Sequence, residues 1–244
     1  MTEAAVITGG TRGIGAAIAT ALAKRKVRLL LNGRHEDAEV KELLAKLGQL
    51  TEVKFVAGDA ADPKVAATLA AEADKHFGRM DYVVPAAGGA HPGRANTLTV
   101  EQWMEAFQVH VHAVFHLFRA TQPALALRGG AFLMIGSIAG KRGCPDSVAY
   151  QTVKGALPQM ARALARDHAK EGIRVNVVEP GIVRTRFHAA MPADVEQNNL
   201  QNRIPLGRFG TPENVASAAM ELLTNPFITG ATLVIDGGTS MRMV

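Results

Sequence analysis

Short apolar runs alternate with longer helix-like stretches along almost the whole chain, and this alternation narrows the possible folds more than any other feature. Seven runs rich in aliphatic and β-branched residues are the predicted strands, at residues 4–8, 27–32, 53–57, 81–85, 131–135, 174–178 and 232–235. The stretches between the first six have apolar residues three to four positions apart, which predicts helices. Regular alternation favours right-handed crossovers, so we expect an α/β fold with helices on both faces of a doubly wound parallel sheet.

The organisation of the chain predicts a single domain over residues 1–244. The sequence contains no repeat, low-complexity tract or linker rich in Pro and Gly. Thr99 followed by Gln102 resembles a capping box, which would open a helix that carries Trp103 to Leu127. Ligands bind beyond the carboxyl ends of the strands in such sheets, so residues that follow strands are the candidates for chemistry.

Composition excludes several classes of protein. A single cysteine, Cys144, forms no internal disulfide and no thiolate zinc site, which predicts a reducing compartment and a cytoplasmic location. No apolar run approaches the roughly 18 residues of a membrane span, and residues 1–3 leave no room for a signal peptide. Aromatic residues make up only 5% and the cations are scattered, which argues against nucleic acid. The net charge of +5 leaves an anionic substrate or a phosphorylated cofactor open.

A glycine-rich turn joins the first predicted strand to the first predicted helix. Its spacing is Gly-x-x-x-Gly-x-Gly, and its candidate ligand-binding residues are Gly9, Thr11, Arg12, Gly13, Ile14 and Gly15. Glycines let the backbone approach a ligand closely, and a helix N-terminus presents free N–H groups to a diphosphate. This placement favours a dinucleotide site over a plain turn between strand and helix.

Residues after the second and third predicted strands indicate which dinucleotide binds. An NAD site usually has an acidic residue about 20 positions past the turn, whereas the second strand here ends at Arg34. Arg34 and Arg12 suit the 2′-phosphate of NADP, so NADP is preferred and NAD remains possible. Glu36 and Asp37 are interpreted as the first turn of the next helix. Two residues after the third strand are candidates for the adenine, with an ordinary turn as the alternative: Asp59 and Ala60.

Three polar side chains form a candidate catalytic group. Tyr150 and Lys154 are four positions apart in a predicted helix and therefore share one face. A phenol with an ordinary pKa of about 10 is a poor acid–base group at neutral pH, and a nearby ammonium is expected to lower that pKa. Ser137 follows the fifth predicted strand, where its hydroxyl would polarise a carbonyl oxygen. The motif Tyr-x-x-x-Lys alone occurs by chance in many sequences. Together with Ser137 at a strand end and an N-terminal dinucleotide turn, it is a specific indication of a catalytic site.

Over residues 4–238 the chain resembles the short-chain dehydrogenase/reductase family. Besides the glycine turn, Ser137, Tyr150 and Lys154, the motifs that match are Asp59, Ala87-Gly88, Asn176, Pro180-Gly181, Thr185 and Asp236-Gly237-Gly238. The resemblance implies a Rossmann-like fold and hydride transfer between a nicotinamide and a ketone or secondary alcohol. It also implies a homotetramer.

The same resemblance assigns roles to residues. Tyr150 would donate and accept the proton, Ser137 would orient the substrate oxygen, and Lys154 would tune Tyr150 and hold the nicotinamide ribose. The further residues that it places at the cofactor are Ala87, Gly88, Pro180, Gly181, Ile182, Val183 and Thr185.

The chain departs from the family pattern at two places that bear on the site. After the fourth strand the family usually has Asn-Asn-Ala-Gly, but this chain has Pro85 and Ala86 in place of the asparagines, and the proline must lie at the strand end. The asparagine that holds a relay water in the family corresponds to His110. Its imidazole would sustain relay with an added pH dependence near about 6.5, unless it is merely structural. His112 and His116 lack a ligand cluster, so no metal site is predicted.

Loops after the fourth, fifth and sixth predicted strands are expected to contact the substrate. The candidate side chains there are His91, Arg94, Lys141, Arg142, Cys144 and His188. Several cations near one opening suit a carboxylate, a phosphate or an acyl-carrier partner, and the alternative is solvated surface charge. Residues 187–204 are expected to form a lid, and their Gln and Asn content favours a hydroxylated substrate.

We therefore expect an NADP-dependent oxidoreductase that acts on a small-molecule or acyl-carrier-bound substrate and resembles reductases of 3-oxoacyl thioesters. A sugar or polyol dehydrogenase that uses NAD or NADP is the alternative within the enzyme class. A non-catalytic, cofactor-binding regulator is the alternative from another class, and the departures at Pro85 and His110 keep it open. Neither nucleic acid nor a membrane is an expected partner.

Overall fold

The computed structural model describes residues 2–188 and 191–241, and the strands in this part of the chain form one parallel sheet. They are β1 (Ala4–Thr8), β2 (Arg28–Gly33), β3 (Val53–Ala57), β4 (Tyr82–Pro85), β5 (Gly130–Ile135), β6 (Ile173–Pro180) and β7 (Thr232–Ile235). Their order across the sheet is β3-β2-β1-β4-β5-β6-β7. This order confirms the predicted doubly wound α/β fold. The chain reverses its direction across the sheet between β1 and β4, where a ligand crevice is expected.

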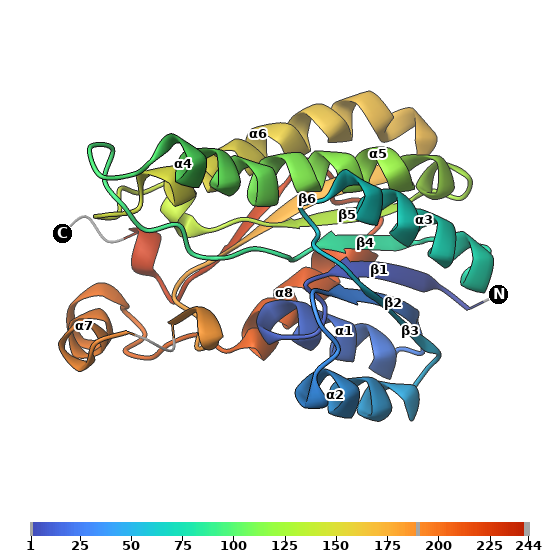
Figure 1. The fold of residues 1–244 in the computed structure, drawn as a ribbon, viewed down its shortest axis with the longest axis horizontal. Helices are drawn as coiled ribbons and strands as arrows, with labels where there is room; N and C mark the ends of the chain where they lie inside the picture. Colours follow the sequence, from blue (N-terminus) through green and yellow to red (C-terminus); the bar gives the residue numbers. More distant parts are fainter. Residues whose placement is uncertain (1, 189–190, 242–244) are drawn as a thin grey trace.

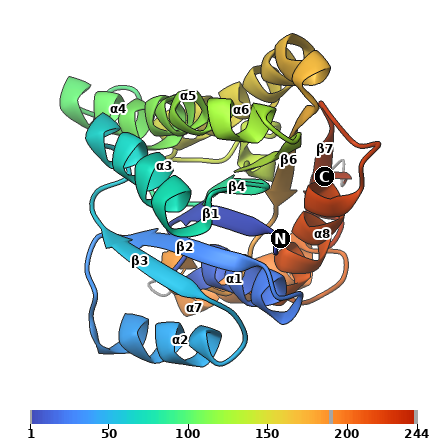
Figure 2. The same ribbon diagram turned by 90° about the vertical axis from the view of Figure 1, so that its right-hand side faces the viewer.

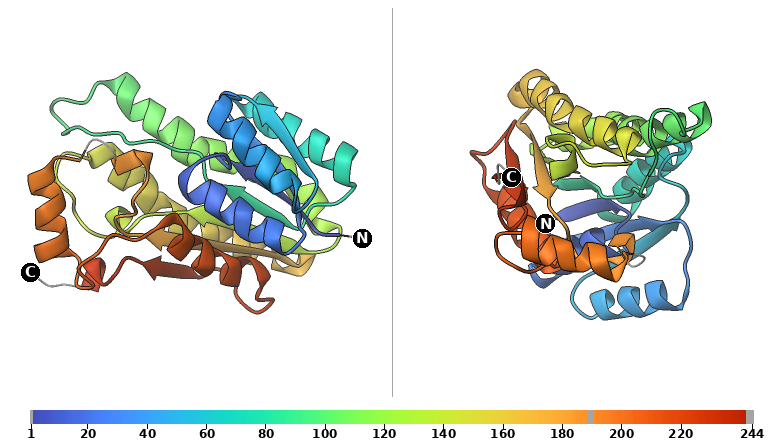
Figure 3. Two further views of the ribbon diagram at one scale, coloured as in Figure 1. Left: turned by 90° about the horizontal axis from the view of Figure 1, so that it is seen from below. Right: turned by 90° about the vertical axis from the view of Figure 1, so that its left-hand side faces the viewer.

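Helices cover both faces of the sheet (Figures 1 and 2). One layer consists of α3 (Pro63–Phe77), α4 (Val100–Phe107), α5 (Ala113–Ala126) and α6 (Val148–His168). The opposite layer consists of α1 (Gly13–Lys24), α2 (Ala38–Gly48) and α8 (Pro212–Thr224), with α1 and α8 side by side (Figure 3). The short helix α7 (Ala193–Asn198) lies beyond the carboxyl ends of the strands.

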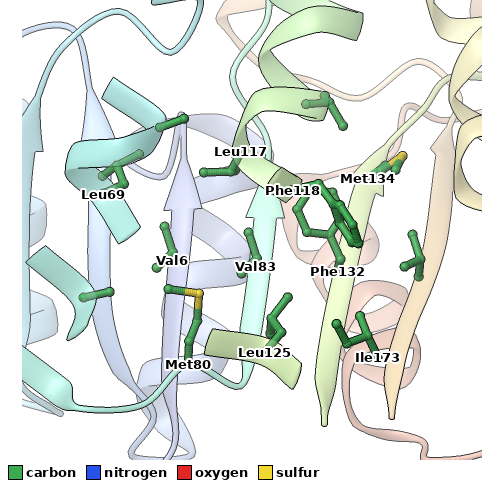
Figure 4. Close-up of a cluster of buried hydrophobic side chains, with 14 of the residues drawn as sticks. Val6, Leu69, Met80, Val83, Leu117, Phe118, Leu125, Phe132, Met134 and Ile173 are labelled. Carbon is green, nitrogen blue, oxygen red and sulfur yellow. The ribbon is translucent and has the colours of Figure 1, made fainter. Parts of the chain in front are cut away.

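Two apolar clusters hold the layers to the sheet because alternate residues of a strand point to opposite faces. Under α3, α5 and α6, the aromatic rings of Phe118 and Phe132 meet edge to face at 5.1 Å, next to Val83 (Figure 4). On the other face Ile7 packs with Ile18 and with residues of α8. The central strand β1 is buried over its whole length, as expected for a parallel sheet covered on both sides.

The expected helix from Trp103 to Leu127 is not one continuous α-helix. Its predicted capping box is confirmed, because the Thr99 hydroxyl accepts from the Gln102 N–H at 3.2 Å and the Gln102 side chain accepts from the Thr99 N–H at 3.0 Å. The helix then widens into a π-helical segment, Gln108–His112, before α5 begins. Such wide turns are frequent at functional sites, and this one contains His110.

Two prolines, one expected at a strand end and one inside a helix, fit the fold. Pro85 is the last residue of β4, which confirms that it lies at the strand end. The helix α6 continues through Pro158 to His168. The backbone around Tyr150 and Lys154 is therefore helical, and the two side chains share a face as expected.

Candidate active site

The glycine turn after β1 packs tightly against the segment after β4. Gly9 has a φ of +60°, and a Cβ there would lie 2.7 Å from the Cα of Ala87. A Cβ on Gly15 would lie 2.3 Å from the carbonyl oxygen of Gly9. No other residue type fits either position without moving the backbone, so these glycines set the shape of the crevice between β1 and β4.

The N-terminus of α1 is open to an anion. The residue before the helix, Arg12, makes no side-chain capping bond, and the first turn holds no acidic side chain. The positive end of the helix dipole and unpaired N–H groups therefore face the crevice. A Cβ on Gly13 would lie 3.4 Å from the Thr185 side chain, which places the segment after β6 against this turn. An open helix N-terminus, glycines without room for a Cβ and a polar hydroxyl fit the diphosphate of a dinucleotide.

Ion pairs occupy the end of the crevice where a 2′-phosphate is expected. The guanidinium of Arg12 pairs with Asp37 and, at 3.3 Å, with Glu39, while Arg186 pairs with the same Glu39 at 2.5 Å. Asp37 caps α2 by accepting from the Val40 N–H at 3.1 Å, which confirms its place in that first turn. The Val40 N–H and the Arg12 charge hold the pKa of Asp37 below its usual value.

Other residues predicted at the cofactor follow the carboxyl ends of β2, β3 and β6. Arg34 is exposed directly after β2. Asp59 is exposed after β3, where its carboxylate accepts from the Ala61 N–H at 3.0 Å, and Ala60 beside it is partly buried. Gly181 abuts the end of β7, since a Cβ on it would lie 2.7 Å from the Cα of Asp236.

The structure brings Ser137, Tyr150 and Lys154 together at the carboxyl ends of the strands. Ser137 follows β5, and its hydroxyl lies near enough to the phenol of Tyr150 to influence the pKa of that group. The Lys154 ammonium lies 5.7 Å from the centroid of the Tyr150 ring and donates to the Ile135 carbonyl at 2.7 Å. A Cβ on Gly140 would lie only 2.7 Å from the backbone nitrogen of Gly155, so the turn after Ser137 packs directly on α6.

Burial determines the acid–base state of this group. Burial raises the pKa of Tyr150 above 10.0, although the nearby Ser137 hydroxyl opposes the change. Burial also lowers the pKa of Lys154 from 10.5 to about 8. The pKa of Tyr150 therefore lies above its ordinary value in the chain by itself, and not below it as expected, because desolvation of the phenolate is the largest effect.

The imidazole of His110 lies beside the phenol and is only 2% exposed. Its ring meets the Tyr150 ring edge to face at 5.6 Å, and its Nε2 lies 3.0 Å from the Gly89 carbonyl oxygen. A Cβ on Gly88 would lie 2.5 Å from the His110 ring, so a glycine is needed there. Burial, and secondly the charge of Lys154, lower the pKa of His110 to about 3. The expected titration near 6.5 is therefore wrong, since this ring stays neutral at physiological pH.

The predicted cluster of free cations on the substrate side is mostly paired. Arg94 pairs with Asp146 at 2.5 Å, and Lys141 pairs with Glu179 at 2.8 Å. Arg142 is exposed. Cys144 lies at a groove of about 350 Å³ next to the N-terminus of α6, and the residues lining this groove are Gly93, Arg94, Ala95, Cys144, Asp146, Ser147, Val148, Gln151 and Thr152.

The expected lid begins in a short 3-10 turn, Arg186–His188, and includes α7 and a π-helical segment, Asn199–Arg203. Residues 189 and 190 and the side chain of His188 lie outside the described part of the chain. The expected lid contacts the catalytic group through Phe187, because the ring of Phe187 lies 5.6 Å from the ring of Tyr150.

Sequence reasoning missed two residues at the site. Phe187 follows the predicted cofactor residue Thr185 and covers Tyr150, and the scarcity of aromatic residues could have drawn attention to it. Glu179 is completely buried at the end of β6, with its side chain against Gly136 and its carboxylate paired with Lys141. The sequence signal for Glu179 was a lone acidic residue next to a run of apolar strand residues.

The described residues contain neither a group of metal ligands nor a helix fit to span a membrane. Among residues 2–188 and 191–241, no three His, Cys, Asp or Glu side chains are grouped so that they could hold a metal ion. In the same part of the chain no helix has both the length and the apolar character needed to cross a membrane.

The strand order, the glycine turn with its open helix N-terminus, and the group of Ser137, Tyr150 and Lys154 define a nicotinamide-dependent oxidoreductase. The chain belongs to the short-chain dehydrogenase/reductase family. A family model described as enoyl-(acyl carrier protein) reductase matches residues 9–240.

Individual relatives are similar over nearly their whole length. The human 3-oxoacyl-[acyl-carrier-protein] reductase is 34% identical, with 99% of each chain covered. The enzyme of the same name from Chlamydia muridarum is 31% identical, with 97% of this chain and 96% of the relative covered. The structure of a short-chain type dehydrogenase/reductase from Mycobacterium ulcerans superposes with a TM-score of 0.93 at 26% identity, and covers 98% of this chain and 90% of that one.

Proposed function

We propose that the chain is an NADPH-dependent reductase of 3-oxoacyl thioesters, with an acyl carrier protein or a small thiol as the carrier. The observation that carries this proposal is the contact of Ser137 with Tyr150, next to Lys154, at the mouth of a dinucleotide crevice. The names of the human and the Chlamydia muridarum relatives support the substrate class.

The side chains divide the work of carbonyl reduction. When bound, the nicotinamide supplies the hydride. Ser137 donates a hydrogen bond to the substrate carbonyl oxygen, and Tyr150 gives that oxygen its proton. A raised pKa keeps the Tyr150 phenol protonated at neutral pH, which is the state that reduction requires. Lys154 supplies a positive charge next to the phenolate that remains.

The other residues of the cofactor site follow from the crevice. Gly9, Thr11, Gly13, Ile14 and Gly15 would hold the diphosphate against the N-terminus of α1. The segments after β4 and β6 would flank the nicotinamide, with the residues Ala87, Gly88, Pro180, Gly181, Ile182, Val183 and Thr185. Asp59 and Ala60 would face the adenine.

The proposed preference for NADPH rests on Arg34. Asp37 and Glu39 already hold Arg12, whereas the side chain of Arg34, directly after β2, is exposed. We expect Arg34→Asp to raise the Kd of NADPH about 10- to 100-fold, as for a lost hydrogen-bonded charge pair, and that of NADH less than about threefold. Nicotinamide fluorescence titration measures both constants. Arg25→Asp, at the far end of α1, is the control, and an equal loss for both cofactors contradicts the assignment of a 2′-phosphate site.

A substrate panel tests the proposed activity. Oxidation of NADPH is followed with acetoacetyl thioesters of coenzyme A and of acyl carrier protein, and with sugar ketones and polyols at the same concentrations. The proposal expects the thioesters to be the best substrates by kcat/KM. Preference for sugars or polyols favours the alternative dehydrogenase, and tight NADPH binding without turnover on any compound favours the regulator.

Exposed apolar side chains on two neighbouring helices bear on the assembly of the protein. Val100, Met104 and Phe115 are exposed apolar side chains on α4 and α5, which supports association with further copies of the chain. We therefore propose a homotetramer, as the family resemblance implies, and a cytoplasmic location, as the single cysteine Cys144 indicates. Light scattering at micromolar concentration tests the tetramer, and a monomeric mass would contradict it.

A further inference from the structure

Glu179 is a charged side chain that lies completely inside the protein, next to the catalytic group. It belongs to β6, and neither of its carboxylate oxygens makes a hydrogen bond within the described part of the chain. The ammonium of Lys141 lies 2.8 Å from its Oε2 and supplies the opposite charge. A carboxylate that has lost its water is costly unless a positive charge accompanies it, so the fold depends on this ion pair.

The Glu179 side chain lies across the end of β5. Val175 and Val177 belong to the apolar cluster under α3, α5 and α6, and alternate residues of a strand share a face, so Glu179 points to the same layer. A Cβ on Gly136 would lie 2.8 Å from the Glu179 Cγ. The Glu179 side chain therefore fills the space that a side chain at position 136 would need, directly before Ser137.

Lys141 ends the short 3-10 turn that Ser137 begins. The Ser137 carbonyl accepts from the Gly140 N–H at 3.0 Å, and the Ile138 carbonyl accepts from the next N–H, that of Lys141, at 2.9 Å. The side chain of Lys141 then returns to β6. Glu179 thus touches the chain just before the turn and also binds the residue that ends it.

The same strand end leads to the segment proposed to flank the nicotinamide. Pro180 and Gly181 follow Glu179 directly, and the Gly181 N–H donates to the Ile235 carbonyl at 3.0 Å, which joins β6 to β7. Glu179 therefore lies between the turn that carries the Ser137 hydroxyl and the segment that would hold the nicotinamide.

We propose that Glu179 and Lys141 are positioning residues for carbonyl reduction. Their ion pair holds the turn 137–141 on β6 and thereby keeps the Ser137 hydroxyl in place for the substrate oxygen. Neither side chain of the pair gives or takes a proton in the reaction. This inference rests on the proposed role of Ser137, and a shift of its hydroxyl by about 1 Å would slow the reaction about 100-fold.

A double-mutant cycle with Ser137 tests this role. We expect Glu179→Gln to lower the kcat for the best panel substrate about 10- to 100-fold, while the KM and the Kd of NADPH change less than about threefold. Ser137→Ala removes the hydroxyl itself and should lower kcat about 100-fold or more. If Glu179 acts through Ser137, adding Glu179→Gln to Ser137→Ala lowers kcat less than about twofold further. A merely structural effect lowers kcat by the same factor in both backgrounds, and that result overturns the proposal.

An apolar pair separates positioning from stability. Lys141→Met leaves the buried carboxylate unpaired, so its urea midpoint should fall below that of Glu179→Gln, which leaves only a partly exposed lysine. The reverse order contradicts the ion pair. When Glu179→Met is combined with Lys141→Met, two apolar side chains of similar volume replace the pair, and stability should return while kcat stays low. Return of kcat together with stability overturns the positioning role.

Glu42→Gln is the matched control. It removes a carboxylate that pairs with Lys46 at 2.6 Å on the exposed side of α2, and its kcat should equal that of the wild type. A raised KM with an unchanged kcat in Lys141→Met makes Lys141 a substrate contact and overturns the positioning role. A wild-type kcat in Glu179→Gln, with Tyr150→Phe inactive, overturns only this inference. If Tyr150→Phe keeps full turnover, the proposed function itself fails instead.

Discussion

Replacing Tyr150 with Phe is expected to lower kcat about a thousandfold or more while the Kd of NADPH changes less than about threefold. The variant removes one hydroxyl and keeps the ring that packs against His110 and Phe187. General acid catalysis contributes about 10²- to 10⁴-fold, and here it would come from this hydroxyl alone. Single-turnover oxidation of NADPH measures the chemical step, and nicotinamide fluorescence measures binding.

The second tyrosine provides the matched control. Tyr82 also loses only a hydroxyl in Tyr82→Phe, where the bond to Glu3 at 2.8 Å is broken far from the site, and its kcat should stay at the wild-type value. In that variant Tyr150 is the one remaining phenol of the chain. Phenolate absorbance then follows Tyr150 alone, and its midpoint should lie above pH 10 in the chain by itself because burial raises its pKa. A kcat of Tyr150→Phe within about tenfold of wild type would exclude the phenol as the acid.

The fold could be predicted because its signals are local. A buried parallel strand needs a short run of aliphatic residues, and the run at 53–57 is observed as β3 with the same bounds. The capping box at Thr99 and the position of Pro85 at the end of β4 likewise depend only on residues that are close in the sequence. The glycine turn was recognisable for the same reason, since a φ of +60° and a close backbone contact both require glycine at position 9.

The electrostatics of the site could not be predicted, because they depend on residues that are distant in the sequence. Arg186 and Glu39 pair across 147 positions, and Lys141 meets Glu179 through the fold rather than through local sequence. The amino-acid sequence by itself also does not show how deeply a side chain is buried. The sequence therefore placed a titrating histidine at position 110, where burial in fact keeps the ring neutral.

The buried amine of Lys154 lowers the stability of the folded protein. Its amine is buried with one hydrogen bond, to the Ile135 carbonyl, and without an ion pair among the interactions described for it. Burial lowers its pKa to about 8, so at pH 7 the folded protein holds a charged amine that desolvation disfavours. A lysine placed in this way serves the reaction at the expense of stability.

Lys154→Met is accordingly expected to lower kcat about 10²-fold or more and to make the protein more stable at pH 7. The lowering of the Lys154 pKa from 10.5 to about 8 means that the buried amine reduces the free energy of unfolding at pH 7 by about 3 kcal/mol. The substitution also leaves the Ile135 carbonyl without its donor, which costs about 1 kcal/mol. The net expected gain is therefore about 2 kcal/mol, measured by urea unfolding.

The stability difference between the wild-type protein and Lys154→Met is expected to depend on pH. Between about pH 8 and 10.5 the unfolded chain holds a proton on Lys154 that the folded chain has released, so the stability of the wild-type protein rises with pH across that window. In Lys154→Met this contribution is absent, and the difference between the two proteins should shrink as the pH approaches 10.5. Lys41→Met, on the exposed face of α2, controls for the loss of a lysine as such. If Lys154→Met is less stable than wild type at pH 7 and the difference does not change with pH, the buried amine does not strain the fold, and a partner for its charge must exist in solution.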